Sequence, residues 1–178
     1  MIPFGLGTII SGVLRLPVIP RGIPACTRLK KKIFICGDHI LIDITPNIQC
    51  WSDRENPLKN YLASLEKVRG LDVGLVLPGH RRVFKNHVER IDELKEHHLT
   101  RAEEVLTILN GAPKNAFQVA SEMTWDIDCD SWDRFPLAQK WFATGEAIAH
   151  LRYLEEEGAA GFRISDLGIR IWTRRTQS

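Results

Sequence analysis

The stretch IFICGDH, at positions 33–39, combines the pattern of a buried strand with a turn that presents a carboxylate. A short apolar run closed by Gly37-Asp38 is typical of a buried strand followed by a turn. Asp38 therefore follows directly on the C-terminal end of a predicted strand. In open α/β architectures, that edge of the sheet is where binding sites are built.

A second stretch of the same design is VGLVLPGH, at positions 73–80. It predicts another buried strand, closed by Pro78-Gly79 and followed at once by His80. Carboxylate and imidazole are ligands suited to zinc or another divalent transition metal. Each motif taken singly is also explained as an ordinary turn, in which an aspartate caps its own backbone. The metal interpretation depends on the two motifs together.

A helix is predicted between these strands. Asn56 is a typical N-cap and Pro57 suits the first helical position, while Gly70 ends the pattern. Apolar residues follow at helical spacing and predict one buried face: Leu58, Tyr61, Leu62, Leu65 and Val68. Strand, helix and strand at this spacing form a βαβ-like unit.

The chain from residue 86 onward is predicted to be mainly helical. Asn86 and Glu89 resemble a capping box that opens the first helix, and residues 116–125 form a second. A third spans residues 136–157, with apolar positions at Leu137, Trp141, Ala147, Leu151 and Leu154. Alternating apolar and polar residues on both sides of the glycine turn at 166–168 predict a hairpin. Three helices followed by a hairpin is the winged-helix order.

Composition narrows the function classes. The 178 residues are 44% hydrophobic and 26% charged, which is ordinary for a globular protein. The net charge of +2 is too small to argue for nucleic-acid binding by itself. The apolar stretch at residues 2–14 is shorter than the roughly 20 residues that span a bilayer, so no membrane partner is expected. Four cysteines without a C-x-x-C pair favour a reducing, cytoplasmic location.

The paired motifs and the helical tail resemble the metallo-β-lactamase fold. FICGDHIL at 34–41 resembles the strand that ends in the family's metal-bridging aspartate, and LVLPGH at 75–80 the strand that ends in its last histidine ligand. AIAHLRYLEEEG at 147–158 resembles the winged-helix domain of one branch, which includes an endoribonuclease and hydroxyacylglutathione-hydrolase-like proteins. The resemblance covers residues 33–178. It implies an α/β fold class: the C-terminal part of an αββα sandwich, followed by a mainly helical winged-helix domain.

The same resemblance implies particular roles for residues. Asp38 would bridge two zinc or other divalent ions, and His80 would complete the second metal site; His39 is not expected to be a ligand. The family's metal lowers the pKa of bound water to about 7, and the resulting hydroxide attacks an ester, thioester or phosphodiester. The implied partner is a small-molecule ester or thioester. The remaining histidines are predicted to be solvated or packed helix residues: His87, His97, His98 and His150.

The departures from the family are equally informative. The signatures THxHxDH and TPGH, which carry most of the family's ligands, do not occur in these 178 residues. A catalytic zinc takes three protein ligands and keeps one open position. With Asp38 and His80 alone, the chain is expected to be an N-terminally truncated, inactive or impaired hydrolase that binds metal weakly. Whether it is an enzyme is left open by the sequence, and so is its oligomeric state.

An RNA-directed function is the alternative. Four arginines lie in or after the predicted hairpin, namely Arg163, Arg170, Arg174 and Arg175. Trp172, in the same hairpin, would stack on a base. Against this, winged helices also serve packing or dimerisation, and the acidic run at 155–157 is close in sequence.

These observations predict three regions: an irregular segment at 1–32, a partial metallo-β-lactamase domain at 33–111, and a winged-helix domain at 112–178 that folds autonomously. We also hypothesise that residues 1–29 are a shifted reading frame. Read one base earlier, codons for IPRGIPA at 19–25 can spell Thr-Pro-Gly-His, and adenines encoding residues 30–32 would restore the frame. Residues 1–29 are therefore predicted to be poorly structured.

Overall fold

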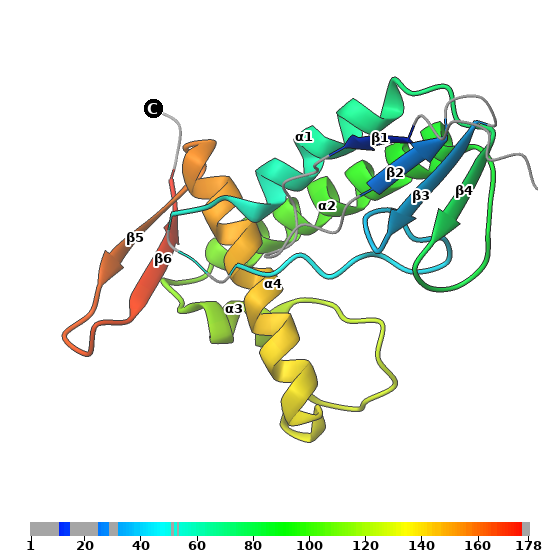
Figure 1. The fold of residues 1–178 in the computed structure, drawn as a ribbon. Helices are drawn as coiled ribbons and strands as arrows, with labels where there is room; N and C mark the ends of the chain where they lie inside the picture. The colour runs from blue at the N-terminus through cyan, green and yellow to red at the C-terminus, as the bar shows by residue number, and fades with distance from the viewer. Residues whose placement is uncertain (1–10, 15–24, 29–31, 51, 53, 176–178) are drawn as a thin grey trace, which may run out of the picture. The chain divides into compact units, whose positions relative to one another are not determined.

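The computed structural model describes residues 11–14, 25–28, 32–50, 52 and 54–175 of an α/β protein. The chain forms two compact units (Figure 1). Unit 1 comprises residues 1–46 and 63–94, and unit 2 comprises residues 47–62 and 95–178. The predicted domain boundaries at residues 33 and 112 stay predictions. Within the described part of the chain, no helix is both long and apolar enough to cross a membrane.

Unit 1 is built on a four-stranded sheet with the order β1-β2-β3-β4 (Figure 1). Its strands are β1 (Ser11–Leu14), β2 (Ala25–Arg28), β3 (Ile33–Gly37) and β4 (Leu75–Pro78). β1 pairs with β2 and β2 with β3 in antiparallel fashion, whereas β3 and β4 are parallel. The predicted strands of the two metal-competent motifs are therefore neighbours that end at the same edge of the sheet.

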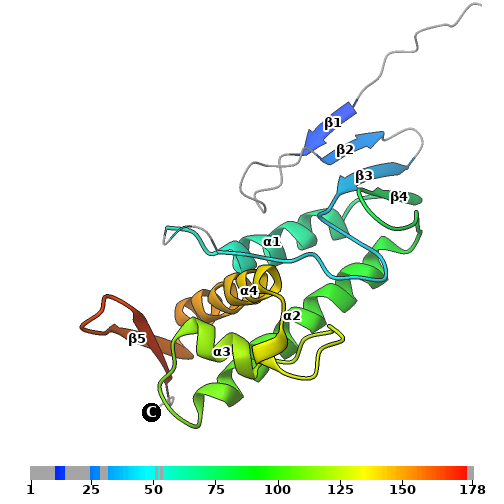
Figure 2. The same ribbon diagram turned by 90° about the horizontal axis from the view of Figure 1, so that it is seen from below.

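One face of this sheet is covered by helices. Phe34 and Cys36 on β3 and Val76 on β4 are fully buried. They share the core with apolar residues of α1 (Pro57–Arg69) and α2 (His87–Leu109), which lie on one side of the strands (Figure 2). Residues on the other face alternate with these, and Ile35 there is 48% exposed. An apolar side chain is thus left open to solvent on the outer face.

The start of α1 follows the sequence prediction. The backbone N–H of Lys59 donates to Oδ1 of Asn56 at 3.1 Å, and Pro57 is the first helical residue. The Asn56 amide also donates to Glu156 at 2.8 Å, and Lys59 forms an ion pair with the same carboxylate. The cap therefore both begins α1 and contacts a second helix of unit 2.

Unit 2 contains the C-terminal part of α2, α3 (Ala116–Glu122), a short 3-10 helix η2 (Trp132–Arg134), α4 (Leu137–Glu156) and a hairpin of β5 (Ala160–Ile164) and β6 (Arg170–Arg174). Backbone bonds between Lys114 and Trp172 join the start of α3 to the hairpin. Its core combines residues of α2, α3, α4, β5 and β6 with Met123 and Phe135, which directly follow α3 and η2. The buried members are Ala102, Val105, Leu109, Val119, Ala120, Met123, Phe135, Ala143, Ala147, Leu151, Leu154, Ala160 and Trp172.

One prediction of local detail was wrong, and one apolar pattern extends beyond the core. Asn86 has a φ of 62°, which is left-handed and differs from the extended conformation of a capping box. The capping box lies instead at α3, between Asn115 and Gln118. On α4, Leu137 is 85% exposed and Trp141 is exposed as well. The buried positions of α4 begin at Ala143.

The first 32 residues also differ from expectation. The sequence offers no periodic pattern there, yet β1 and β2 extend the sheet from β3. Strand pairing uses backbone N–H and C=O groups, which every residue except proline supplies, so a strand can form without a side-chain pattern. Residues 1–10, 15–24 and 29–31 lie outside the described part of the chain. The shifted-frame hypothesis for residues 1–29 stays a prediction.

Candidate functional site

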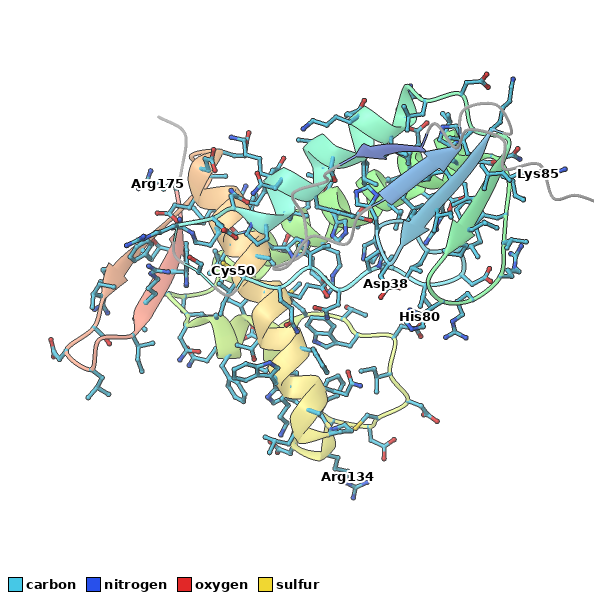
Figure 3. The ribbon with its side chains drawn as sticks, in the orientation of Figure 1. Asp38, Cys50, His80, Lys85, Arg134 and Arg175 are labelled. Atoms are coloured by element: carbon cyan, nitrogen blue, oxygen red, sulfur yellow. The ribbon has the colours of Figure 1, made fainter. Side chains whose placement is uncertain are left out.

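Asp38 and His80 meet at the shared edge of β3 and β4. Gly37 is in register with Pro78, so the residues that follow the two parallel strands emerge side by side. Nδ1 of His80 lies 2.6 Å from Oδ1 of Asp38, within hydrogen-bond distance. Figure 3 shows the two labelled residues together at this edge. The His80 side chain is 69% exposed and the Asp38 side chain 37% exposed, so the pair faces solvent and a ligand can reach it.

Gly79 makes this approach possible. A Cβ at this position would lie 2.7 Å from Oδ1 of Asp38 and 3.2 Å from the carbonyl carbon of Gly37. The Gly79 N–H donates to the Gly37 carbonyl at 2.8 Å, which continues the strand pairing to the residue before His80. Gly37 has a φ of 53°, a conformation that glycine adopts without steric cost. The two glycines therefore hold the carboxylate and the imidazole against each other.

The loop that follows Asp38 is held by two arginines. From α2, Arg90 donates to the carbonyl of Leu41 at 2.7 Å and to the carbonyl of Ile44 at 2.9 Å. Arg82 makes two hydrogen bonds to Asp43, at 3.0 and 2.8 Å, and these lower the pKa of that exposed carboxyl. Sequence analysis missed both contacts, because an arginine that binds carbonyls of a distant loop leaves no local pattern.

His39 and Cys36 belong to the interior of unit 1. The ring of His39 is buried, and its Nε2 lies 2.6 Å from the Ser64 hydroxyl. Burial lowers the pKa of His39 to about 4, so the ring is neutral at physiological pH. Burial also raises the pKa of the Cys36 thiol to about 11, and the thiol donates to the Ile40 carbonyl at 3.2 Å. Neither group has the exposure of a ligand or a nucleophile at this edge.

The chemistry of the Asp38–His80 pair suits a divalent metal, but the donor set is small. No group of three or more histidine, cysteine, aspartate or glutamate residues converges on one point among the described residues. A hydrolytic zinc centre requires three protein ligands. The oxygen and nitrogen of the pair also lie at hydrogen-bonding distance from each other. The described residues therefore do not hold a metal by themselves.

The helix histidines of unit 2 form a buried pair. Nδ1 of His150 donates to the Glu146 carbonyl at 2.9 Å, which leaves its Nε2 as an acceptor. The N–H at Nδ1 of His98 then faces this acceptor at 3.4 Å. Burial is the main reason that the pKa of both rings is lowered, and the pKa of His150 falls to about 4. The pair is neutral and packed, and within the described part of the chain no acidic or cysteine side chain completes a metal site with it.

The hairpin carries exposed arginines but no exposed aromatic platform. Arg163, Arg174 and Arg175 are exposed. Trp172 is only 1% exposed and packs on Phe162 at 4.9 Å between ring centroids. The expectation that Trp172 stacks on a base is therefore wrong. The Trp172 ring is instead a buried part of the core of unit 2.

Comparison with known proteins supports the fold. A metallo-β-lactamase family protein from Thermus thermophilus matches 93% of this chain with a TM-score of 0.76 and 32% identity. A β-lactamase domain protein from Burkholderia ambifaria matches 93% with a TM-score of 0.75 and 30% identity. The chain spans 49% and 47% of these two structures, about half their length.

A curated protein is similar over a shorter region. The β-lactamase-like protein 2 homolog of Caenorhabditis elegans is 36% identical over 52 residues, which are 29% of this chain and 18% of that protein. No family model matches the sequence. The two structural matches share both the fold and nearly a third of the residues over almost the whole chain. The protein therefore has part of the metallo-β-lactamase family fold.

Proposed function

We propose that this chain supplies one wall of a metal-dependent hydrolase site, in which Asp38 and His80 are metal ligands. The substrate class is a small ester, thioester or phosphodiester. The observation that carries the proposal is the convergence of the two side chains, 2.6 Å apart, at the C-terminal ends of adjacent parallel strands. The metallo-β-lactamase family fold supports it.

The local structure favours a site over an ordinary pair of turns. A turn needs no contact between its side chains, whereas here Gly79 leaves the space that Asp38 occupies beside His80. Arg90 fixes the following loop through two backbone carbonyls and leaves the Asp38 carboxylate to face solvent. A carboxylate and an imidazole held together in this way are a preformed pair of ligands.

The remaining ligands must come from polypeptide outside the described residues. Two donors from one wall bind zinc weakly, so we expect the isolated 178-residue chain to retain little zinc and to lack hydrolase activity. Zinc titration followed by dialysis and elemental analysis tests this. Near-stoichiometric zinc that survives dialysis and is lost in His80→Ala would contradict it. Asp43→Asn, which removes a nearby carboxylate engaged with Arg82, is the matched control for Asp38→Asn.

A chimera tests the positive side of the proposal. The part of the Thermus thermophilus protein that this chain does not match is fused ahead of residue 33. We expect the chimera to bind zinc and to hydrolyse chromogenic ester, thioester or phosphodiester substrates. Asp38→Asn and His80→Ala should each remove zinc and activity, and Asp43→Asn should remove neither. A folded, active chimera that tolerates loss of Asp38 and His80 would refute the assignment.

RNA binding by the hairpin is a second candidate, favoured by the exposed Arg163, Arg174 and Arg175. It is tied to the proposal that residues 112–178 are a winged-helix domain. Because Trp172 is buried, binding would rest on phosphate contacts, which weaken steeply with salt. Titration of single-stranded RNA at rising salt, with an Arg163→Gln/Arg174→Gln variant, tests this. Absence of salt-dependent binding by the wild-type chain would exclude it.

A further inference from the structure

His39 directly follows the candidate ligand Asp38, yet its side chain lies in the interior of unit 1. The Asp38 side chain is 37% exposed, whereas His39 is 5% exposed. The His39 Nε2 lies 2.6 Å from the hydroxyl of Ser64, a fully buried residue of α1. Neighbouring side chains of one turn therefore have opposite surroundings, solvent and a helix. We propose that His39 is a positioning residue, whose contact with Ser64 holds the turn so that Asp38 meets His80.

The turn that carries these residues is closed by contacts of its own. The His39 N–H donates to the Cys36 carbonyl at 3.0 Å, and the Cys36 thiol donates to the Ile40 carbonyl at 3.2 Å. These bonds shape the turn, but they join it only to the end of its own strand, β3. The contact with Ser64 joins the turn to a helix 25 positions further along the chain. It therefore adds a constraint on the direction in which the turn faces.

The polar character of the buried contact matters for this role. An apolar side chain at position 39 would fill the same space, but apolar packing is non-directional. A hydrogen bond depends on both distance and angle, so it selects one orientation of the two groups. Rotation of the turn would break the 2.6 Å contact inside the core, where a lost hydrogen bond costs more than at the surface. The pair thus opposes rotations that an apolar residue would tolerate.

The tautomer of His80 reports whether Asp38 is in place. An ionised carboxylate only accepts hydrogen bonds, so the Nδ1 of His80, 2.6 Å from Oδ1 of Asp38, carries the proton. Loss of the carboxylate from this position removes the cause that favours the Nδ1–H form. Ring nitrogen-15 chemical shifts of His80 in the 178-residue chain give the ratio of the two tautomers. They are measured at about pH 9, where an ordinary imidazole is neutral.

Substitutions on both sides of the contact test the proposal. His39→Met keeps a long side chain without the hydrogen bond, whereas His39→Gln keeps both the length and a polar end. Ser64→Ala removes the hydroxyl from the helix side. We expect the Nδ1–H to Nε2–H ratio of His80 to fall roughly three- to tenfold in His39→Met and in Ser64→Ala, which corresponds to one ordinary hydrogen bond. In His39→Gln the ratio should stay near the wild-type value.

Two controls separate positioning from stability. Val68→Ala truncates a fully buried apolar residue one turn further along α1, so it should destabilise unit 1 and leave the His80 tautomer unchanged. Asp38→Ala should remove the preference for Nδ1–H altogether. An unchanged ratio in folded His39→Met and Ser64→Ala proteins would overturn the proposal, and so would a wild-type ratio that Asp38→Ala does not alter.

The value of this contact for metal binding rests on the proposed function of Asp38 and His80. That function is tested by zinc binding and hydrolysis in the chimera, whereas the tautomer ratio is measured on the metal-free chain. A chimera that binds zinc without Asp38 and His80 would refute the ligand assignment and leave the positioning result as measured. A chimera that requires both ligands, together with a ratio insensitive to His39→Met and Ser64→Ala, would refute the positioning role alone.

Discussion

Acidification should destabilise unit 2 through its buried histidine pair. His98 and His150 are fully buried and both are neutral, and desolvation is the main cause of their lowered pKa values. In the unfolded chain each ring recovers an ordinary pKa of 6.5. The folded-state pKa of His150 is about 4. Between pH 6.5 and 4, the ring is therefore protonated in the unfolded state and neutral in the folded state. The contribution of the two neutral rings to the free energy of unfolding is therefore fully present above pH 6.5, and it is lost as the pH drops through this window.

The magnitude follows from the width of the window. At pH 5 the unfolded rings are 1.5 pH units below their pKa, and each unit is worth about 1.36 kcal/mol. Each ring thus lowers the free energy of unfolding by about 2 kcal/mol between pH 7.5 and 5, and the pair lowers it by about 4 kcal/mol. Natural domains have only about 5–15 kcal/mol, so the loss should be plain in urea unfolding curves.

The double variant His98→Gln/His150→Gln isolates the effect. It lacks both titrating rings, so the difference in unfolding free energy between it and the wild type should shrink by about 4 kcal/mol from pH 7.5 to 5. Glu146, whose pKa is raised by burial, stabilises the fold as the pH falls, but it is present in both proteins and cancels. His39, whose pKa is lowered by burial, destabilises the fold as the pH falls, but it too is present in both proteins and cancels. His97→Gln, next to His98 on α2, is the control. A pH-independent difference would refute the reasoning.

Three further outcomes are expected. Gly79→Ala should destabilise unit 1 by about 1–3 kcal/mol in urea unfolding, because its Cβ would displace the Asp38 carboxylate and strain the strand ends. The exposed Ile35 should promote self-association at high protein concentration, and Ile35→Lys should reduce it in analytical ultracentrifugation, since it places a charge on the outer face of the sheet. A fragment of residues 95–178 should melt cooperatively and at a higher temperature than residues 112–178, because the core of unit 2 includes residues of α2.

Each of these outcomes has a control. Gly70→Ala should be nearly neutral, because a Cβ there would have no neighbour within 4 Å. Leu99→Lys changes an exposed apolar residue on α2 and should leave self-association as it is in the wild type. Val105→Ala in the longer fragment should lower its melting temperature towards that of the shorter one. Equal melting of the two fragments would show that α2 adds nothing to unit 2.

The sequence predicts those elements that have a local cause. Asn56 and Pro57 mark the start of α1, because a cap and a fixed φ act within one turn. The predicted strands before Asp38 and His80 are confirmed. They too have a local cause, since a buried strand is marked by a run of apolar residues. That both strands are parallel neighbours explains how the two candidate ligands meet.

What the sequence does not reveal depends on distant partners. His98 and His150 lie 52 positions apart, and no local sequence pattern around either residue indicates that the two rings pair. The sequence assigns no role to Cys50, because its place near Ile148 of α4 and Ile169 of the hairpin depends on long-range folding. Leu137 fits a helical apolar stripe and yet is exposed, because periodicity shows which face a residue occupies but not how far along the helix the core extends.

The backbone bond from Gly79 to Gly37 separates the position of the site from its chemistry. The spacing of the two following residues is set by main-chain pairing, not by the side chains they carry. The backbone therefore places the side chain of residue 80 beside Asp38 whichever amino acid stands there. Cysteine or aspartate at this position would arrive at the same edge at little cost to the fold. Under the proposed ligand role of Asp38 and His80, a single codon change at position 80 would alter the metal that the completed site prefers, while the sheet beneath it stays as it is.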